Sequence, residues 1–195
     1  MTENDLPIVY LARHGETAWS LSGQHTGLTD LALTERGQHT ARRLGERLKG
    51  LALKRVFTSP LQRARRTCEL AGFAAVAEVD PELVEWDYGD YEGRTTAQIQ
   101  ADHPSWSLWT DGVPHGETVD EVAVRADAVI ARAVAVDGDV ALFAHGHILR
   151  ILAARWLALS PENGRLFALG TGSVSTLGYE RQTRVITRWN LSPSA

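Results

Sequence analysis

The chain has 195 residues, 44% of them hydrophobic and 23% charged, with a formal net charge of −4. We expect residues 1–195 to form a single domain, because this length suffices for one sizeable core and barely for two. The slightly acidic charge gives no reason to expect nucleic acid or a membrane as partner, and no apolar stretch approaches the roughly 18 residues of a membrane-spanning helix.

The cysteine content and the start of the chain bear on the cellular compartment. Cys68 is the single cysteine, which rules out an internal disulfide and is typical of a reducing compartment. Residues 1–7 contain two acidic side chains and no basic one, unlike a secretory signal peptide. We therefore expect a cytoplasmic protein.

The first predicted element is a buried strand at residues 8–11, an unbroken apolar run that leads into Arg13, His14 and Gly15. The ends of strands are where open α/β sheets bind their ligands. An arginine beside a histidine at such a point indicates an anion, most plausibly a phosphate. Residues 19–30 have no apolar period and are predicted to be an ordered loop.

A helix is predicted to begin at the N-cap Thr34, with apolar residues at helical spacing and Gly50 near its end. Residues 56–58 are predicted to form a second strand. In residues 59–62 we expect a helix start, with serine as N-cap, proline in the first helical position and glutamine completing a capping box.

The middle of the chain is predicted to hold a short strand at 76–79 and a short helix at 95–101, with no long element between residues 80 and 114. A second capping box at residues 118–121 predicts a long helix. The aromatic residues of this stretch are expected over a cleft: Trp86, Tyr88, Tyr91 and Trp106.

Residues 140–144 form another apolar strand, which runs directly into His145 and Gly146. A helix at 149–159 and two strands at 174–179 and 184–189 complete the prediction. Because strands alternate with helices through most of the chain, we expect an α/β fold with a mainly parallel central sheet flanked by helices.

A phosphatase that uses histidine needs a nucleophilic nitrogen, cations for the phosphoryl oxygens and a proton donor for the leaving oxygen. His14 is the candidate nucleophile; in isolation, such a histidine is more often a hydrogen-bonded core residue. Arg13, Arg63 and His145 are the candidate phosphate ligands. The alternative for Arg63 is a surface arginine, since further arginines follow it at positions 65 and 66.

The proton donor is sought among four carboxylates in residues 83–93. A carboxyl group beside aromatic rings is partly desolvated, which raises its pKa and lets it act as a general acid. Spacing alone does not choose among Glu85, Asp87, Asp90 and Glu92.

Together, residues 13–17, 59–67, 85–93 and 144–146 resemble, in order, the motifs of the histidine phosphatase superfamily, the phosphoglycerate mutase-like enzymes. The resemblance implies a phosphoglycerate mutase-like fold. It implies phosphorylation of His14 on its imidazole, phosphate binding by Arg13, Arg63 and His145, and Glu85 as the proton donor and later the base. No metal or cofactor is expected.

Within the superfamily, the sequence is most similar to histidine-type sedoheptulose-1,7-bisphosphatases and to broad acid phosphatases often labelled as mutases. The mutases carry a longer, basic insert after the Glu85 motif, whereas residues 91–117 are short here. The resemblance implies substrate contacts at further positions: Ser20, Thr26, Gly27, Tyr88, Gly146 and His147.

We therefore expect a metal-independent phosphatase acting on a small phosphorylated substrate. The alternatives are a 2,3-bisphosphoglycerate-dependent phosphoglycerate mutase and a non-catalytic phosphate-binding module. His25 is intermediate, since it lies in the substrate loop, whereas His39, His103 and His115 are expected to be background. Trp106 and Trp109 are expected to be exposed, where they would serve a homo-oligomer interface or a lid.

Overall fold

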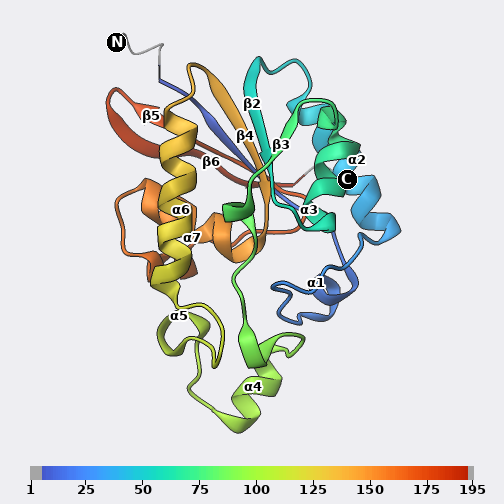
Figure 1. The fold of residues 1–195 in the computed structure, drawn as a ribbon, viewed down its shortest axis with the longest axis vertical. Helices are drawn as coiled ribbons and strands as arrows, with labels where there is room; N and C mark the ends of the chain where they lie inside the picture. The colour runs from blue at the N-terminus through green and yellow to red at the C-terminus, as the bar shows by residue number, and fades with distance from the viewer. Residues whose placement is uncertain (1–5, 193–195) are drawn as a thin grey trace.

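One mixed, mostly parallel sheet organises the described part of the chain, residues 6–192, in a computed structural model (Figure 1). The strand order is β3-β2-β4-β1-β5-β6. The first four strands of that order run parallel, while β5 is antiparallel to both β1 and β6. This confirms the predicted α/β class. The strands are β1 (Val9–Arg13), β2 (Leu53–Thr58), β3 (Ala77–Val79), β4 (Asp139–Ala144), β5 (Val174–Glu180) and β6 (Thr183–Leu191).

Helices cover both faces of the sheet. In Figure 1, α6 and α7 lie on one face and α2 and α3 on the other, whereas α1, α4 and α5 lie beyond the carboxyl ends of the parallel strands. The helices are α1 (Ala18–Ser22), α2 (Glu35–Leu48), α3 (Gln62–Cys68), α4 (Thr96–Asp102), α5 (Leu108–Asp111), α6 (Val119–Val134) and α7 (Gly146–Trp156), and a 3₁₀ segment, η4 (Pro161–Leu166), follows α7.

Strand register brings the predicted site residues together. In the pairing of β1 with β4, Arg13 lies opposite Ala144. In the pairing of β2 with β4, Thr58 lies opposite Phe143. The residues that follow these strands, His14, Ser59 and His145, therefore emerge side by side at one edge of the sheet.

Two helix starts predicted from capping residues, at Thr34 and Thr118, are confirmed, and the short helix predicted at residues 95–101 is present as α4. The hydroxyl of Thr34 accepts from the N–H of Gly37 at the start of α2. Thr95 and Thr118 each form a complete capping box, at α4 and α6. Cys68 is buried as expected, and this burial raises the pKa of its thiol to about 12.

Two helix boundaries differ from the prediction. The capping box at residues 59–62 is wrong, because α3 begins only at Gln62, whose backbone N–H donates to Asp30 Oδ1 at 2.7 Å. The hydroxyl of Ser59 instead lies 2.7 Å from His145 Nε2. The helix predicted at 149–159 begins already at Gly146 and ends at Trp156.

The prediction of exposed tryptophans is wrong. Trp106 and Trp109 are only 6% and 9% exposed and belong to the main hydrophobic core. The Trp106 indole donates to the carbonyl of Gly112 at 2.9 Å. Neither ring is therefore available to an interface in this structure, and the homo-oligomer stays a prediction without this support.

Among residues 6–192, no helix combines the length and the apolar character that crossing a membrane requires.

Candidate active site

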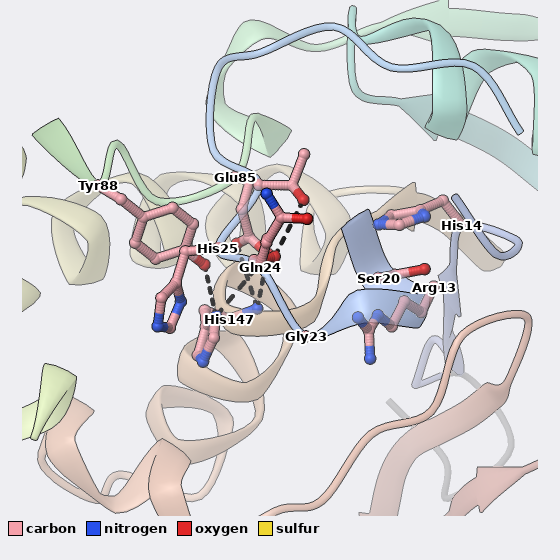
Figure 2. Close-up of a pocket in the computed structure, with 10 residues that line it drawn as sticks. Arg13, His14, Ser20, Gly23, Gln24, His25, Glu85, Tyr88 and His147 are labelled. Carbon is pink, nitrogen blue, oxygen red and sulfur yellow. Dashed lines mark hydrogen bonds and ion pairs between the residues drawn. The ribbon is translucent and has the colours of Figure 1, made fainter. Parts of the chain in front are cut away.

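A cavity of about 180 Å³ opens at the carboxyl ends of the parallel strands. Figure 2 shows Arg13 and His14 on one side of it, and Glu85, Tyr88 and His147 on the other. These five residues come from segments up to 134 positions apart (147 − 13). The remaining lining residues are Ser20, Gly23, Gln24, His25 and Thr26.

His14 is held as a neutral imidazole. Its Nδ1 lies 2.7 Å from the carbonyl oxygen of Gly15 and must carry the ring proton, since a carbonyl only accepts. Burial, reinforced by the charges of Arg13 and Arg63, holds the pKa of His14 well below 6.5. The lone pair is therefore on Nε2, as a nucleophilic imidazole requires.

The loop that carries His14 is fixed by close backbone contacts. The N–H of Gly15 donates to the hydroxyl of Thr67 on α3 at 2.9 Å. A Cβ on Gly15 would lie 2.4 Å from the carbonyl oxygen of Gly37 on α2, so no larger residue fits without movement. Gly37 and Thr67 were not singled out from the sequence, because neither contact has a local pattern.

Arg13 presents an incompletely bonded guanidinium. Its Nη1 donates to the carbonyl of Leu169, while Nε is a buried nitrogen without a hydrogen-bond partner among the described residues. A Cβ on Gly146 would lie 3.3 Å from the Arg13 Cζ, so the guanidinium packs against the start of α7. Arginine donors left open beside a histidine suit an oxyanion.

Arg63 and His145 lie behind the cavity lining. Arg63 is fully buried, and its Nε donates to His145 Nδ1 at 3.1 Å. Its other donors go to the carbonyls of Thr26, Gly27 and Thr29. Because Nδ1 of His145 accepts, its proton is on Nε2. The imidazole rings of His14 and His145 lie 5.2 Å apart.

Glu85 is the carboxylate that lines the cavity. It is 4% exposed and accepts from the backbone N–H groups of Trp86, His147 and Ile148 at 2.9–3.1 Å. Two of these donors belong to the first turn of α7, where the helix dipole stabilises negative charge. The rivals Asp87, Asp90 and Glu92 bind other partners and do not line the cavity.

Tyr88 and His147 form a hydrogen-bonded pair beside Glu85. The phenol oxygen lies 2.5 Å from His147 Nδ1. Burial, and then the Glu85 charge, hold the pKa of Tyr88 well above 10, so the phenol keeps its proton. Burial, and then Arg150, hold the pKa of His147 well below 6.5. The phenol therefore donates to Nδ1, and His147 carries its proton on Nε2.

The loop of residues 23–27 forms the remaining wall. Thr26 lines the cavity, as does Ser20 on α1, whereas Gly27 does not, because its N–H donates to Glu92 and its carbonyl accepts from Arg63. Gly23 and Gln24 were not predicted as lining residues, although they lie in the loop that carries the resemblance. Gln24 is anchored by its amide N–H to the carbonyl of Gly93 at 2.8 Å.

The other histidines behave as expected. His25 lines the cavity and packs on Tyr88, with ring centres 4.9 Å apart. His39, His103 and His115 are exposed and lie outside the cavity. Within residues 6–192, no group of three or more His, Cys, Asp or Glu side chains is arranged to hold a metal ion.

Comparison with known proteins gives consistent matches. A family model described as "Histidine phosphatase superfamily (branch 1)" matches residues 9–192. The chain is 44% identical over 178 residues to an acid phosphatase of Mycobacterium tuberculosis, covering 89% of this chain and 87% of that one. It is 38% identical over 189 residues to the sedoheptulose 1,7-bisphosphatase of Saccharomyces cerevisiae, covering 80% and 69%.

A protein named phosphoglycerate mutase GpmB from Erwinia tasmaniensis is 31% identical over 191 residues, covering 93% of this chain and 89% of that one. A solved Mycobacterium tuberculosis structure superimposes with a TM-score of 0.92 at 41% identity, covering 96% of this chain and 99% of that chain. With matches over nearly its whole length, the chain belongs to the histidine phosphatase superfamily.

Proposed function

We propose that the protein is a phosphatase that hydrolyses small phosphate monoesters through a phosphohistidine on His14. The family and the relatives named acid phosphatase and bisphosphatase support this. The observation that carries the proposal is the neutral, buried His14, whose Nδ1 is bonded to Gly15, in a cavity that is also lined by Arg13, whose Nε has no hydrogen-bond partner among the described residues.

In the first step, the lone pair on His14 Nε2 attacks phosphorus and the bond from phosphorus to the leaving oxygen breaks. Arg13 binds phosphoryl oxygens as charge develops on them. Glu85, entering this step protonated, gives its proton to the leaving oxygen, which departs as an alcohol.

In the second step, water attacks the phosphohistidine and the Glu85 carboxylate takes a proton from it. The N–P bond breaks, phosphate is released and His14 returns to its neutral form. Glu85 regains the proton that it gave up, so the cycle closes without a further reagent.

We assign supporting roles to the other residues around the cavity. Arg63 supplies positive charge and His145 supplies a neutral donor behind the phosphoryl group, and direct contact with that group requires both residues to exchange their present hydrogen-bond partners. Ser20 and Thr26 are assigned to phosphoryl oxygens, and Tyr88 with His147 to the leaving-group side. Gly146 lets Arg13 approach α7, and Gly27 holds Arg63 through its carbonyl.

The test is release of phosphate from p-nitrophenyl phosphate, with a chelator present throughout. His14→Ala removes the nucleophile and should lower kcat by roughly 10³-fold or more. His39→Ala, an exposed histidine on α2, is the matched control and should keep the wild-type rate. Undiminished turnover by His14→Ala would remove His14 from the mechanism, and loss of wild-type turnover with chelator would show a metal requirement.

The mutase alternative has its own signature, and it is kept because several relatives are named probable phosphoglycerate mutase GpmB. It requires exchange of phosphate between the 3- and 2-positions of phosphoglycerate to outrun phosphate release. Reaction mixtures that contain 3-phosphoglycerate answer this, because 2-phosphoglycerate and free phosphate are measured together. A protein that binds inorganic phosphate yet turns over none of these compounds would instead be a binding module.

A further inference from the structure

The wall of the cavity that faces away from Arg13 and His14 carries no lysine or arginine side chain among the described residues. It is made by Gln24, His25, Tyr88 and His147. Burial lowers the pKa of His25, and the pKa of His147 lies well below its ordinary value. Near neutral pH, this wall therefore offers neutral donors, acceptors and ring faces.

The polar groups on this wall are oriented by their surroundings. Since Tyr88 donates to His147 Nδ1, the proton of His147 is fixed on Nε2 as a donor. Gln24 gives its amide N–H to Gly93, and its amide oxygen accepts from the Ser22 hydroxyl at 2.5 Å. These are the groups that hydroxyls recognise, because each hydroxyl both donates and accepts.

The nearby cations are already engaged elsewhere. Arg63 uses its donors on His145 and on loop carbonyls. Arg150 stacks over Trp109 at 4.6 Å and donates to the carbonyls of Gly164 and Arg165 on η4. Apart from Arg13, no lysine or arginine among the described residues lines the cavity.

No cation is left in the cavity for a second anion. Arg13 is assigned to the transferring phosphoryl group, and Glu85 lines the cavity with both of its oxygens bonded to backbone N–H groups at α7. A second anionic group on the substrate would therefore find no cation to balance it, whether or not Glu85 carries its proton. An uncompensated charge in a partly buried site is costly.

The size of the cavity also favours a small leaving group. A cavity of about 180 Å³ is smaller than the roughly 300–1,000 Å³ that is usual for drug-sized ligands. One side of it is the contact between His25 and Tyr88, whose ring centres are 4.9 Å apart. Such a ring pair accommodates the C–H face of a small carbon skeleton.

We propose that the leaving group is a small, uncharged, hydroxyl-bearing alcohol, and that the site selects against substrates with a carboxylate or a second phosphate. This inference rests on the proposed phosphatase function and narrows it. Specificity here comes from the absence of a partner for the second anion as much as from hydrogen bonds to hydroxyls.

The test compares two substrates that differ in one group. Glycerol 3-phosphate and 3-phosphoglycerate share a carbon skeleton, but the second has a carboxylate where the first has a hydroxymethyl group. We expect kcat/KM for glycerol 3-phosphate to be at least tenfold higher, and that for fructose 6-phosphate to exceed that for fructose 1,6-bisphosphate. Equal values, or a preference for the anionic member of either pair, would overturn the inference.

A matched pair of variants tests whether charge is the cause. Gln24→Lys puts a cation on the wall, and Gln24→Met has a similar length without charge; both lose the bond to Gly93. The preference for glycerol 3-phosphate should be at least fivefold smaller in Gln24→Lys than in Gln24→Met. The same preference in both variants would contradict an electrostatic origin.

Hydrolysis of p-nitrophenyl phosphate by the wild-type protein distinguishes a failure of the leaving-group inference from a failure of the proposed phosphatase function. If that compound is hydrolysed while the substrate pairs show no discrimination, only the leaving-group inference fails. If neither it nor any phosphate ester is hydrolysed, the proposed function fails and this inference falls with it.

Discussion

Four histidines lie in or behind the cavity, and three of them are held neutral by a specific partner. His14 gives its Nδ1 proton to the carbonyl of Gly15, His145 accepts at Nδ1 from Arg63, and His147 accepts at Nδ1 from Tyr88. Burial is the largest cause of the lowered pKa of all three. Only for His14 does this arrangement leave the lone pair on Nε2, which distinguishes it from its neighbours as the proposed nucleophile.

This pattern makes the stability of the ligand-free protein depend on pH. Below about 6.5 the unfolded chain protonates these histidines while the folded protein does not, so the free energy of unfolding falls as pH falls. The expected slope is up to about 1.4 kcal/mol per pH unit for each histidine, or about 4 for the three. Urea unfolding at a series of pH values between 7.5 and 5 measures it.

A single substitution measures how much of the pH dependence of the unfolding free energy comes from one histidine. His145→Asn removes one of the three buried imidazoles and should reduce the slope by about 1.4 kcal/mol per pH unit. His39→Asn, on the exposed surface of α2, should keep the wild-type slope. A wild-type slope in His145→Asn would mean that His145 binds its proton equally in both states.

At the scale of elements, the segment that carries Glu85 is held by an ion pair from α6. Arg125 donates to both oxygens of Glu117 at 2.8 Å and to the carbonyls of Glu82 and Val84 at 2.8 and 3.0 Å. Glu117 in turn accepts from the backbone N–H of Asp87. Arg125 therefore positions the segment that carries Glu85, the proposed general acid, without lining the cavity itself.

Replacing Arg125 should affect substrates unequally. An alkyl phosphate needs a proton on its leaving oxygen, whereas p-nitrophenolate leaves with little help, so displacement of Glu85 harms the first reaction more. We expect Arg125→Gln to lower kcat for glycerol 3-phosphate about tenfold more than kcat for p-nitrophenyl phosphate.

Arg132→Gln is the matched control for this experiment. Arg132 lies on the same helix and pairs with Asp80 at 2.7 Å, away from Glu85. It should lower the two rates equally, if at all, and Arg125→Lys should restore part of the lost rate. An equal loss on both substrates in Arg125→Gln would indicate a general structural role.

For the whole molecule, the sheet divides the core into two clusters that share its strands. Successive residues of β4 point to opposite faces, so Leu142 packs in the cluster under α6 and α7 and Phe143 in the cluster under α2 and α3. Both side chains are fully buried. Because each cluster depends on the same strands, we expect them to unfold together.

Truncation on either face tests the prediction of a single domain. Leu142→Ala should cost about 2–5 kcal/mol and Phe143→Ala about 3–5 kcal/mol of unfolding free energy. Each variant should retain one transition that far-ultraviolet circular dichroism and tryptophan fluorescence report at the same urea concentration. Val79→Ala, on the exposed edge strand β3, should cost little. Two separate transitions would show that the faces unfold independently.

Sequence patterns predicted structure where the signal is local. The caps at Thr34 and Thr118 bond to residues within one turn, so the pattern contains both partners. The same pattern was misleading at Ser59, because the closer partner of its hydroxyl is His145, 86 positions away at 2.7 Å, and the local bond from the Leu61 N–H is longer, at 3.3 Å. The burial of Trp109 was missed for the same reason, since residues distant in sequence cover its ring.

The sequence by itself determined the alternation of strands and helices, the placing of Arg13, His14 and His145 at strand ends, and the family. Each of these depends on local periodicity or on contiguous motifs. The tertiary structure alone decided that Glu85, rather than its three rivals, lines the cavity. It also decided that Arg63 is bonded to the loop carbonyls and that no lysine or arginine lies on the cavity wall formed by Gln24, His25, Tyr88 and His147. These features depend on hydrogen bonds and burial between segments far apart in the chain, which no local pattern encodes.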